Sequence, residues 1–210
     1  MNENAKLIHL FTDMNALKEV RRFGEHTFGM YNKVFNESVA EHVFHMVLMA
    51  DKLIEAFDLS DLDYKRIIQL ITYHDSCEYG MKEDYDALIA AKDLEYKKQK
   101  EQAELQNIRL LAERHGEFIY DLWNEYEQQK TEEAKFVKAV DKLQCTMHTL
   151  HRGLQFYTPE QQAYEATYAI KAIQSFPLLK PFYQAVQEEI KRVYLEKGLY
   201  WDDKWFLEER

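Results

Sequence analysis

The sequence predicts an all-α protein, and three observations carry that prediction. Glycine and proline are scarce in the 210 residues, with six and three copies, which disfavours a turn-rich β protein. Apolar residues recur at three- and four-residue spacing along most of the chain, as they do on the buried face of a helix. We find no segment in which apolar and polar residues alternate as in a half-buried strand.

Residues 1–210 are expected to form one domain, because no linker rich in proline, glycine or serine divides the chain. Hydrophobic residues make up 46% of the sequence, which is ample for a core. The formal net charge is −10. This argues against a nucleic-acid duplex or an anionic membrane surface as the main partner, since both require clustered lysine and arginine. A small anionic substrate stays open, because local cations outweigh distant acids.

Two cysteines, Cys77 and Cys145, lie far apart and match neither a disulfide framework nor a zinc-finger spacing. This usage fits a reducing cytosol. No apolar run approaches the roughly 20 residues of a membrane span. The N-terminus also lacks the basic and apolar regions of a signal peptide. We therefore expect a cytoplasmic protein with no membrane partner.

The N-terminal part is predicted to contain two helices separated by a loop. An apolar stripe marks the first helix at about residues 4–20, and residues 21–36 follow as a loop. Ser38 is the expected N-cap of the second helix, which extends to about residue 57. Glu41, three residues after Ser38, completes a capping box.

The middle of the chain is predicted to be helical with one irregular stretch. A helix from about residue 61 ends near residue 78, and residues 80–93 begin irregularly and become helical. Residues 95–114 form a long charged helix whose charges are most simply a solvated face. Residues 116–129 are expected to be helical as well.

The C-terminal part is predicted to hold three more helices and a tail. One begins near Thr131 and carries an apolar stripe to about Leu150. Pro159 suits the first position of the next helix, whose stripe continues to about residue 173. A last helix covers about residues 181–195, and the aromatic, acidic tail is expected to pack on the body.

Four polar residues interrupt the apolar stripes of three predicted helices: His42, the adjacent pair His74 and Asp75, and Asp141. Each has an ordinary explanation alone, as a boundary histidine or a solvent-facing aspartate. A buried carboxylate is costly, however, unless it is paired or binds a metal. Together the two imidazoles and two carboxylates form a donor set that suits Mn²⁺, Fe²⁺, Co²⁺ or Zn²⁺.

The order H…HD…D resembles the signature of the HD-domain metal-dependent phosphohydrolases, and in particular their 5′-deoxynucleotidase branch. The resemblance covers about residues 15–155 and is weak over residues 156–210. It implies a single compact helical bundle with a metal site between helices, on which the C-terminal helices pack. The stretches that carry it are LKEVRRFG, NESVAEHVFHMVLMA, YHDSCEYG and KAVDKLQC.

The resemblance implies that His42, His74, Asp75 and Asp141 bind one divalent ion. Co²⁺, Mn²⁺, Mg²⁺, Fe²⁺ and Zn²⁺ are all candidates. Such an ion polarises a phosphoryl oxygen and lowers the pKa of the water that attacks phosphorus. His45, three residues after His42, is interpreted as a core or boundary histidine and not as a further ligand.

Three further residues receive roles from the resemblance. Glu78, one turn after His74 on the expected helix, would orient or deprotonate the attacking water or protonate the leaving oxygen. Arg22 would hold phosphate, with Arg21 as its rival. An acid in the following loop would help to fix the substrate. Asp84 fits this place if one residue is inserted, and Glu83 fits without the insertion.

The resemblance thus implies an enzyme that hydrolyses (deoxy)nucleoside 5′-monophosphates to nucleoside and phosphate, with a homodimer as its assembly. One alternative is a nucleotide triphosphohydrolase or pyrophosphohydrolase of the same superfamily. For that reaction Lys97, Lys98 and Lys100 are candidate cations for the additional phosphates. A second alternative is a non-catalytic metal-binding sensor. The retained Glu78 and the complete donor set argue against the sensor.

Overall fold

The structure is a computed structural model that describes residues 2–22, 37–81, 85, 87–152 and 158–207. The all-α prediction is confirmed, because these residues contain helices and turns and only one isolated β-bridge, between Arg21 and Ser38. The α-helices are α1 (Glu3–Met14), α2 (Val39–Ala56), α3 (Tyr64–Tyr73), α4 (Ala87–Lys92), α5 (Leu94–His115), α6 (Phe118–Gln128), α7 (Glu132–Arg152), α8 (Pro159–Thr167), α9 (Ile170–Ser175) and α10 (Lys180–Glu196). Short 3₁₀ turns are η1 (Asn15–Lys18), η3 (Ser76–Glu78), η4 (Pro177–Leu179) and η5 (Asp203–Trp205).

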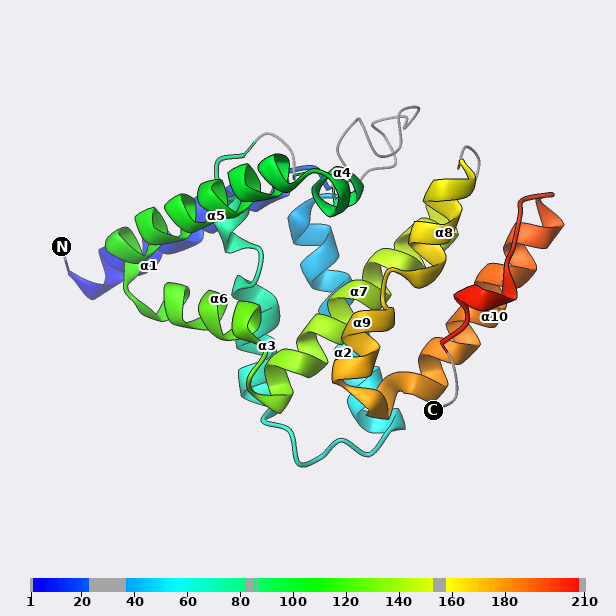
Figure 1. Ribbon diagram of the computed structural model, residues 1–210. Helices are drawn as coiled ribbons and strands as arrows, with labels where there is room; N and C mark the ends of the chain where they lie inside the picture. The colour runs from blue at the N-terminus through cyan, green and yellow to red at the C-terminus, as the bar shows by residue number, and fades with distance from the viewer. Residues whose placement is uncertain (1, 23–36, 82–84, 86, 153–157, 208–210) are drawn as a thin grey trace.

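Helix α7 lies at the centre of the bundle and packs against α2, α3, α6, α9 and α10. Figure 1 shows α1, α5 and α6 on one side of α7, and α8, α9 and α10 on the other. Phe136, Val140 and Leu143 of α7 are fully buried in the main apolar core, together with Met46 of α2 and Ile71 of α3. A polar residue on this face of α7 therefore lies close to both α2 and α3.

The start of α2 is fixed by the capping box that the sequence predicts. The Ser38 hydroxyl accepts a hydrogen bond from the backbone N–H of Glu41 at 3.2 Å. In return, Oε2 of Glu41 accepts one from the backbone N–H of Ser38 at 2.6 Å. Because the capping box satisfies two of the backbone N–H groups at this end, the first turn of α2 has a defined direction. That turn carries His42 on its buried side.

Helix α3 ends earlier than the sequence suggested. The prediction of a helix to about residue 78 is wrong, since α3 ends at Tyr73 and η3 follows. The hydroxyl of Ser76 donates a 2.6 Å hydrogen bond to the carbonyl of Tyr73, which satisfies a group that a continued helix would have bonded. His74 is the C-cap residue of α3, so Asp75 and Glu78 lie where the chain turns away from the helix.

Two C-terminal predictions have different outcomes. The helix expected to continue to about residue 173 is instead divided into α8 and α9 at Tyr168–Ala169. The prediction that the tail packs on the body is confirmed, because Leu207 is buried and its N–H donates a 2.9 Å hydrogen bond to Oε1 of Gln187 in α10. Among the described helices, none has the length and apolar composition that crossing a membrane requires.

Candidate metal centre

Three helices bring His42, His74 and Asp141 together in the interior. Each contributes one potential ligand atom, and these atoms lie within 4.8 Å of one another. The distance from Nε2 of His42 to Oδ1 of Asp141 is 3.4 Å. All three side chains are buried. His42 comes from the first turn of α2, His74 from the end of α3 and Asp141 from the middle of α7.

Asp75 completes the predicted set at the side of the group that faces solvent. Its Oδ2 lies 3.1 Å from Nε2 of His74 and 3.7 Å from Nε2 of His42. The side chain is 16% exposed, whereas the two imidazoles are fully covered. The structure therefore brings the four residues together, and their role as metal ligands stays a prediction.

The imidazole nitrogens of the centre have the chemistry of metal ligands. Nδ1 of His74 lies 2.9 Å from the carbonyl oxygen of Ile71, which can only accept, so Nδ1 carries the hydrogen. Nε2 of His42 and Nε2 of His74 are both buried and have no hydrogen-bond partner among the described residues. Buried nitrogens without partners are costly. A divalent cation beside two such nitrogens and two carboxylates would satisfy all four groups.

The charges of the centre also favour a cation. Burial alone would raise the pKa of Asp75, but the charges of His74 and Arg22 hold this pKa far below its usual range. Burial likewise opposes ionisation of Asp141, while Lys142 and His42 hold its pKa well below the usual value. Both carboxyl groups are therefore ionised at neutral pH, as ligands of a divalent metal must be.

At His42, a proton would compete with a metal ion for the imidazole. Burial and the charge of Arg22 lower the pKa of His42, but the contacts of the imidazole with Asp141 and Glu37 outweigh them and raise it. The carboxylates of Asp141 and Glu37 thus favour a positive charge at this imidazole, either a proton or a metal ion. Since a metal binds only the neutral imidazole, metal binding at this centre would displace a proton.

The two candidate arginines have clearly different positions. Arg22 is buried, and its Nη1 lies 2.5 Å from Oδ2 of Asp75. Arg21 is half exposed and its Nη1 lies 3.5 Å from Glu41 on the outside of α2. The structure therefore places Arg22, and not Arg21, at the centre.

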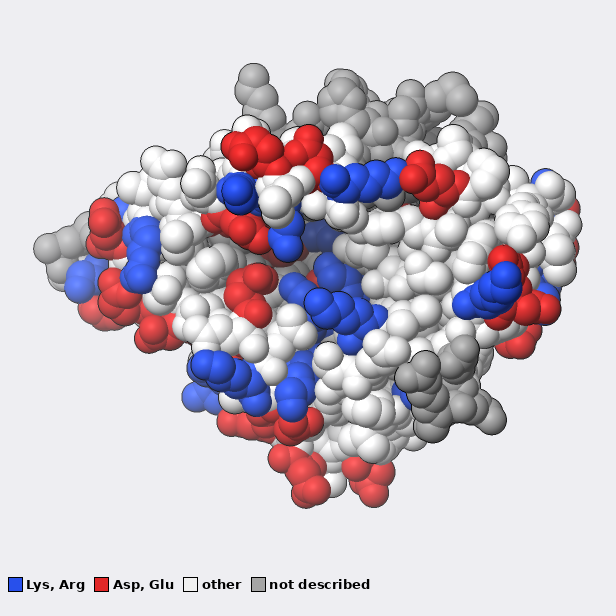
Figure 2. All heavy atoms as spheres, in the orientation of Figure 1, with Lys and Arg blue, Asp and Glu red and all other residues white. Residues whose placement is uncertain are grey.

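Three of the four candidate ligands lie at a cavity of about 910 Å³, and the fully buried His42 is not among its lining residues. Arg22, His74, Asp75 and Asp141 line it, as does Glu78, which is buried in η3. Figure 2 shows this hollow near the middle of one face, with lysine and arginine side chains gathered along it. The predicted roles of Asp84 and its rival Glu83 fall outside the described residues.

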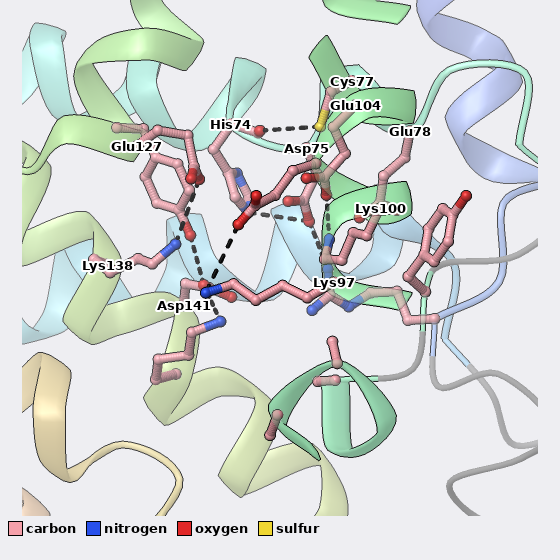
Figure 3. Close-up of a pocket in the computed structure, with 18 of the residues that line it drawn as sticks. His74, Asp75, Cys77, Glu78, Lys97, Lys100, Glu104, Glu127, Lys138 and Asp141 are labelled. Atoms are coloured by element: carbon pink, nitrogen blue, oxygen red, sulfur yellow. Dashed lines mark hydrogen bonds and ion pairs between the residues drawn. The ribbon is translucent and has the colours of Figure 1, made fainter. Parts of the chain in front are cut away.

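The cavity wall is rich in cations, and sequence reasoning anticipated only some of them. The described lining includes six acidic side chains and seven cationic ones, which are Arg22, Lys92, Lys97, Lys100, Lys138, Lys142 and Lys171. Figure 3 shows Lys97 and Lys100 approaching the space around Asp75 from α5, and Lys138 approaching from α7. The charged face of α5 is thus only partly solvated, and Lys98 is exposed and absent from the lining.

Lys138 and Lys142 were missed by sequence reasoning. They lie three residues before and one residue after Asp141 on α7. Nζ of Lys142 lies 3.0 Å from Oδ2 of Asp141 and donates a 3.0 Å hydrogen bond to the hydroxyl of Tyr168. Their spacing from Asp141 gave no distinct signal, because the adjacent Lys142 does not share the helical face of Asp141 and a lysine three residues away is common on a solvated helix.

The fold and this centre define a class of protein. The chain belongs to the HD domain family, whose sequence model matches residues 14–177. This confirms the resemblance that the motifs indicate.

Individual relatives agree with that membership. The chain is 35% identical to the 5′-deoxynucleotidase HDDC2 of Mus musculus over 144 residues, which are 68% of this chain and 67% of the relative. It is 30% identical to the 5′-deoxynucleotidase HDDC2 of Dictyostelium discoideum over 175 residues, or 80% of this chain and 85% of that protein. A crystal structure described as a predicted metal-dependent phosphohydrolase from Magnetospirillum magnetotacticum superposes with a TM-score of 0.61. It covers 90% of this chain and 96% of its own at 21% identity, which supports the fold alone.

Proposed function

We propose that this protein is a metal-dependent phosphomonoesterase that hydrolyses (deoxy)nucleoside 5′-monophosphates to nucleoside and phosphate. The observation that carries the proposal is the pair of buried, unpartnered Nε2 atoms of His42 and His74 beside two ionised carboxylates at the floor of an open cavity. The names of the HDDC2 relatives support the choice of nucleotide as substrate.

In this proposal His42, His74, Asp75 and Asp141 hold one divalent ion, whose identity is open among Co²⁺, Mn²⁺, Mg²⁺, Fe²⁺ and Zn²⁺. When bound, the ion would act as a Lewis acid on the phosphoryl group and lower the pKa of water. The short distances among the four side chains support this assignment.

Arg22 and Glu78 have separate roles. The Arg22 guanidinium, fixed beside Asp75, is a permanent cation at the cavity that can attract and bind phosphate oxygens. Glu78 is buried at the cavity wall, where a carboxyl group can accept a proton from the attacking water or deliver one to the leaving 5′-oxygen. Both roles need a side chain that is held in place, which the burial of these two residues supports.

The charge of the cavity supports an anionic substrate. Cations outnumber acids among its described lining residues, although the whole chain carries a net charge of −10. A divalent ion at the floor would add two further positive charges. Such a local field attracts a phosphate dianion in spite of the acidic surface elsewhere.

The triphosphohydrolase alternative receives less support from the same wall. Lys97 and Lys100 reach the cavity, but Lys97 lies 3.7 Å from Glu101 and Lys100 forms an ion pair with Glu104. These glutamates also line the cavity and offset the charge that additional phosphates would require. A monophosphate needs only the cations at the floor.

The proposal also includes a cytoplasmic location and a homodimer. Cys77 and Cys145 are buried and are not joined in a disulfide, which suits a reducing compartment. The dimer follows from the family resemblance, and the exposed Phe44 and Leu48 on α2 offer apolar surface for it. Light scattering of the purified protein would measure its mass, and a monomer would contradict the dimer.

The deciding experiment measures phosphate release by metal-stripped protein. Nucleoside mono- and triphosphates are supplied, and Co²⁺, Mn²⁺, Mg²⁺, Fe²⁺ or Zn²⁺ is added back. We expect metal-dependent phosphate from deoxynucleoside monophosphates, abolished in Asp75→Ala and retained in the control Asp61→Ala, whose side chain is exposed. Activity on triphosphates alone would move the protein to the alternative reaction. Stoichiometric metal binding without turnover of any substrate would contradict catalysis.

A further inference from the structure

A chain of buried polar groups leads away from the candidate metal centre on the far side of His42. Nδ1 of His42 lies 2.5 Å from Oε1 of Gln144, which is on α7 one turn after Asp141. Nε2 of Gln144 donates a 3.0 Å hydrogen bond to Oε2 of Glu37 and lies 3.1 Å from Nδ1 of His45. Gln144 is fully buried and Glu37 is 8% exposed.

The chemistry of these groups fixes the direction of the hydrogen bonds. Glu37 also lies near the guanidinium of Arg22, so its carboxylate is the acceptor and the amide nitrogen of Gln144 is the donor. The amide oxygen of Gln144 must then face His42. Because that oxygen can only accept, Nδ1 of His42 carries the hydrogen. In the neutral ring Nε2 of His42 is therefore left with a lone pair, and this atom lies 3.4 Å from Oδ1 of Asp141 and 3.7 Å from Oδ2 of Asp75.

Gln144 is the group that can impose this state on His42. The other contact of Nδ1 is with Oε1 of Glu37 at 3.6 Å, which is too long for a hydrogen bond. His74 needs no such residue, since the carbonyl of Ile71 fixes its ring directly. The two imidazoles are therefore oriented by different means, one by backbone and the other by a side chain 102 residues away in sequence.

Glu37 connects the same chain to the phosphate-binding side of the site. Its backbone carbonyl accepts a 3.0 Å hydrogen bond from the N–H of Arg22. Its Oε1 lies 3.7 Å from Nε of Arg22. A single buried glutamate thus contacts Arg22 directly and reaches His42 through Gln144.

We propose that Gln144 and Glu37 are positioning residues: Gln144 holds His42 in the Nδ1–H tautomer with Nε2 presented to the metal, and Glu37 fixes both Gln144 and Arg22. The inference rests on the proposed function for the identity of the centre. It assigns roles to two residues, Glu37 and Gln144, that lie inside the stretches NESVAEHVFHMVLMA and KAVDKLQC but received no role from the resemblance. Outer-shell partners of this kind change metal affinity by about 10- to 100-fold when they are removed.

The first test measures Co²⁺ affinity by calorimetry, without any turnover. Gln144→Met keeps the length of the side chain and removes its amide, and we expect Co²⁺ to bind about 10- to 100-fold more weakly. The matched control is Gln187→Met, because Gln187 is also fully buried but bonds to the carbonyl groups of Ala166 and Trp205. An affinity of Gln144→Met within twofold of wild type, or an equal loss in Gln187→Met, would overturn the role of Gln144.

A second measurement covers the case in which Gln144→Met does not fold. The ¹⁵N spectrum of the imidazole groups in metal-free wild-type protein, recorded above the pKa of His42, distinguishes the two tautomers. We expect the Nδ1–H form at His42, identified by the disappearance of its signals in His42→Gln. An Nε2–H form would overturn the proposal whatever the variants do.

The role of Glu37 has its own variant. Glu37→Gln keeps the size of the side chain but removes the charge that faces Arg22. We expect both Co²⁺ and inorganic phosphate to bind at least fivefold more weakly, whereas Gln144→Met weakens phosphate binding less than Co²⁺ binding. Unchanged phosphate affinity in Glu37→Gln would remove Arg22 from the proposal. If the protein proves inactive on every nucleotide, the affinities and the tautomer still decide the positioning roles.

Discussion

The hydroxyl of Tyr126 donates a 2.6 Å hydrogen bond to Oδ2 of Asp141, and both groups are buried. Burial and the charge of Asp141 raise the pKa of Tyr126 well above its usual value, so the phenol stays protonated and remains a donor. The same ring packs against His74, with centroids 4.9 Å apart. Helix α6 therefore orients two groups of the candidate centre through one side chain.

Tyr126→Phe should weaken metal binding while it leaves the ring packing in place. We expect Co²⁺ affinity to fall about tenfold, as for other outer-shell partners. Stability should fall by about 1–2 kcal/mol, because a buried acceptor loses a partner. Calorimetry and urea unfolding measure the two effects. Tyr183→Phe is the control, since its buried hydroxyl bonds to the carbonyl of Ala166 away from the site. Equal Co²⁺ affinity in Tyr126→Phe and Tyr183→Phe would contradict a role of the Tyr126 hydroxyl in metal binding.

Helix periodicity predicted most of the fold because most of the described helices bury one face. The break after Tyr73 was the main error of this kind. Apolar spacing continues through LITYHDSCEYG, so periodicity alone gave a helix that extends to Glu78. The actual end depends on a side-chain bond from Ser76 to the carbonyl of Tyr73, and such local competition leaves no mark on the apolar pattern.

The site was predictable where its residues belong to short motifs and was missed where they meet only in space. His42, the pair His74–Asp75 and Asp141 could be chosen because each interrupts an apolar stripe. Gln144 and Lys138 share α7 with Asp141, yet glutamine and lysine are common on helices and nothing in their spacing separates them from a solvated face. Their partners, His42 and Glu127, are brought to them only by the packing of α2 and α6 against α7.

Lys138→Met should impair substrate binding more than turnover. Nζ of Lys138 lies 4.1 Å from the centroid of the Tyr126 ring and 3.5 Å from Glu127 at the cavity wall. If this cation attracts the phosphate of the substrate, its loss should raise KM about 10-fold, which corresponds to about 1.4 kcal/mol. Steady-state kinetics with a deoxynucleoside monophosphate separate KM from kcat. Lys135→Met, one turn earlier and paired with Glu132, serves as the control. A change in kcat alone would argue against a binding role.

Removal of the metal should destabilise the fold, because two carboxylates and two unpartnered imidazole nitrogens would be left together in the interior. An ion present at 100 times its Kd stabilises by about 2.7 kcal/mol. For a chain of this size we therefore expect excess EDTA to lower the Tm by about 5–10 °C. Thermal unfolding with and without EDTA measures the shift. Asp141→Asn should show little or none of it, and a large shift in that variant would place the stabilising ion elsewhere.

The ion pair between Arg66 of α3 and Glu125 of α6 should make stability depend on pH in acid. Nε of Arg66 donates a 2.9 Å hydrogen bond to Oε2 of Glu125, and the hydroxyl of Thr131 donates one of 2.8 Å to Oε1. Burial opposes ionisation, but these bonds outweigh it and lower the pKa of Glu125 below its ordinary value of 4.5. A lowered pKa in the folded state means that the folded protein favours the ionised form. The stabilisation is therefore complete above about pH 4.5 and is lost as the pH falls through the lower, folded-state pKa.

Glu125→Gln tests this dependence directly. At pH 7 we expect it to cost about 1 kcal/mol, as for a partly exposed charged pair, and the difference from wild type should shrink as the pH is lowered below 4.5. Urea unfolding at several pH values measures both quantities. In an Arg66→Met background the Glu125→Gln difference should be smaller and should vary less with pH, because the main partner of the carboxylate is gone. A difference between wild type and Glu125→Gln that stays constant from pH 7 to pH 3 would contradict the prediction, because it would show that folding does not lower the pKa of Glu125.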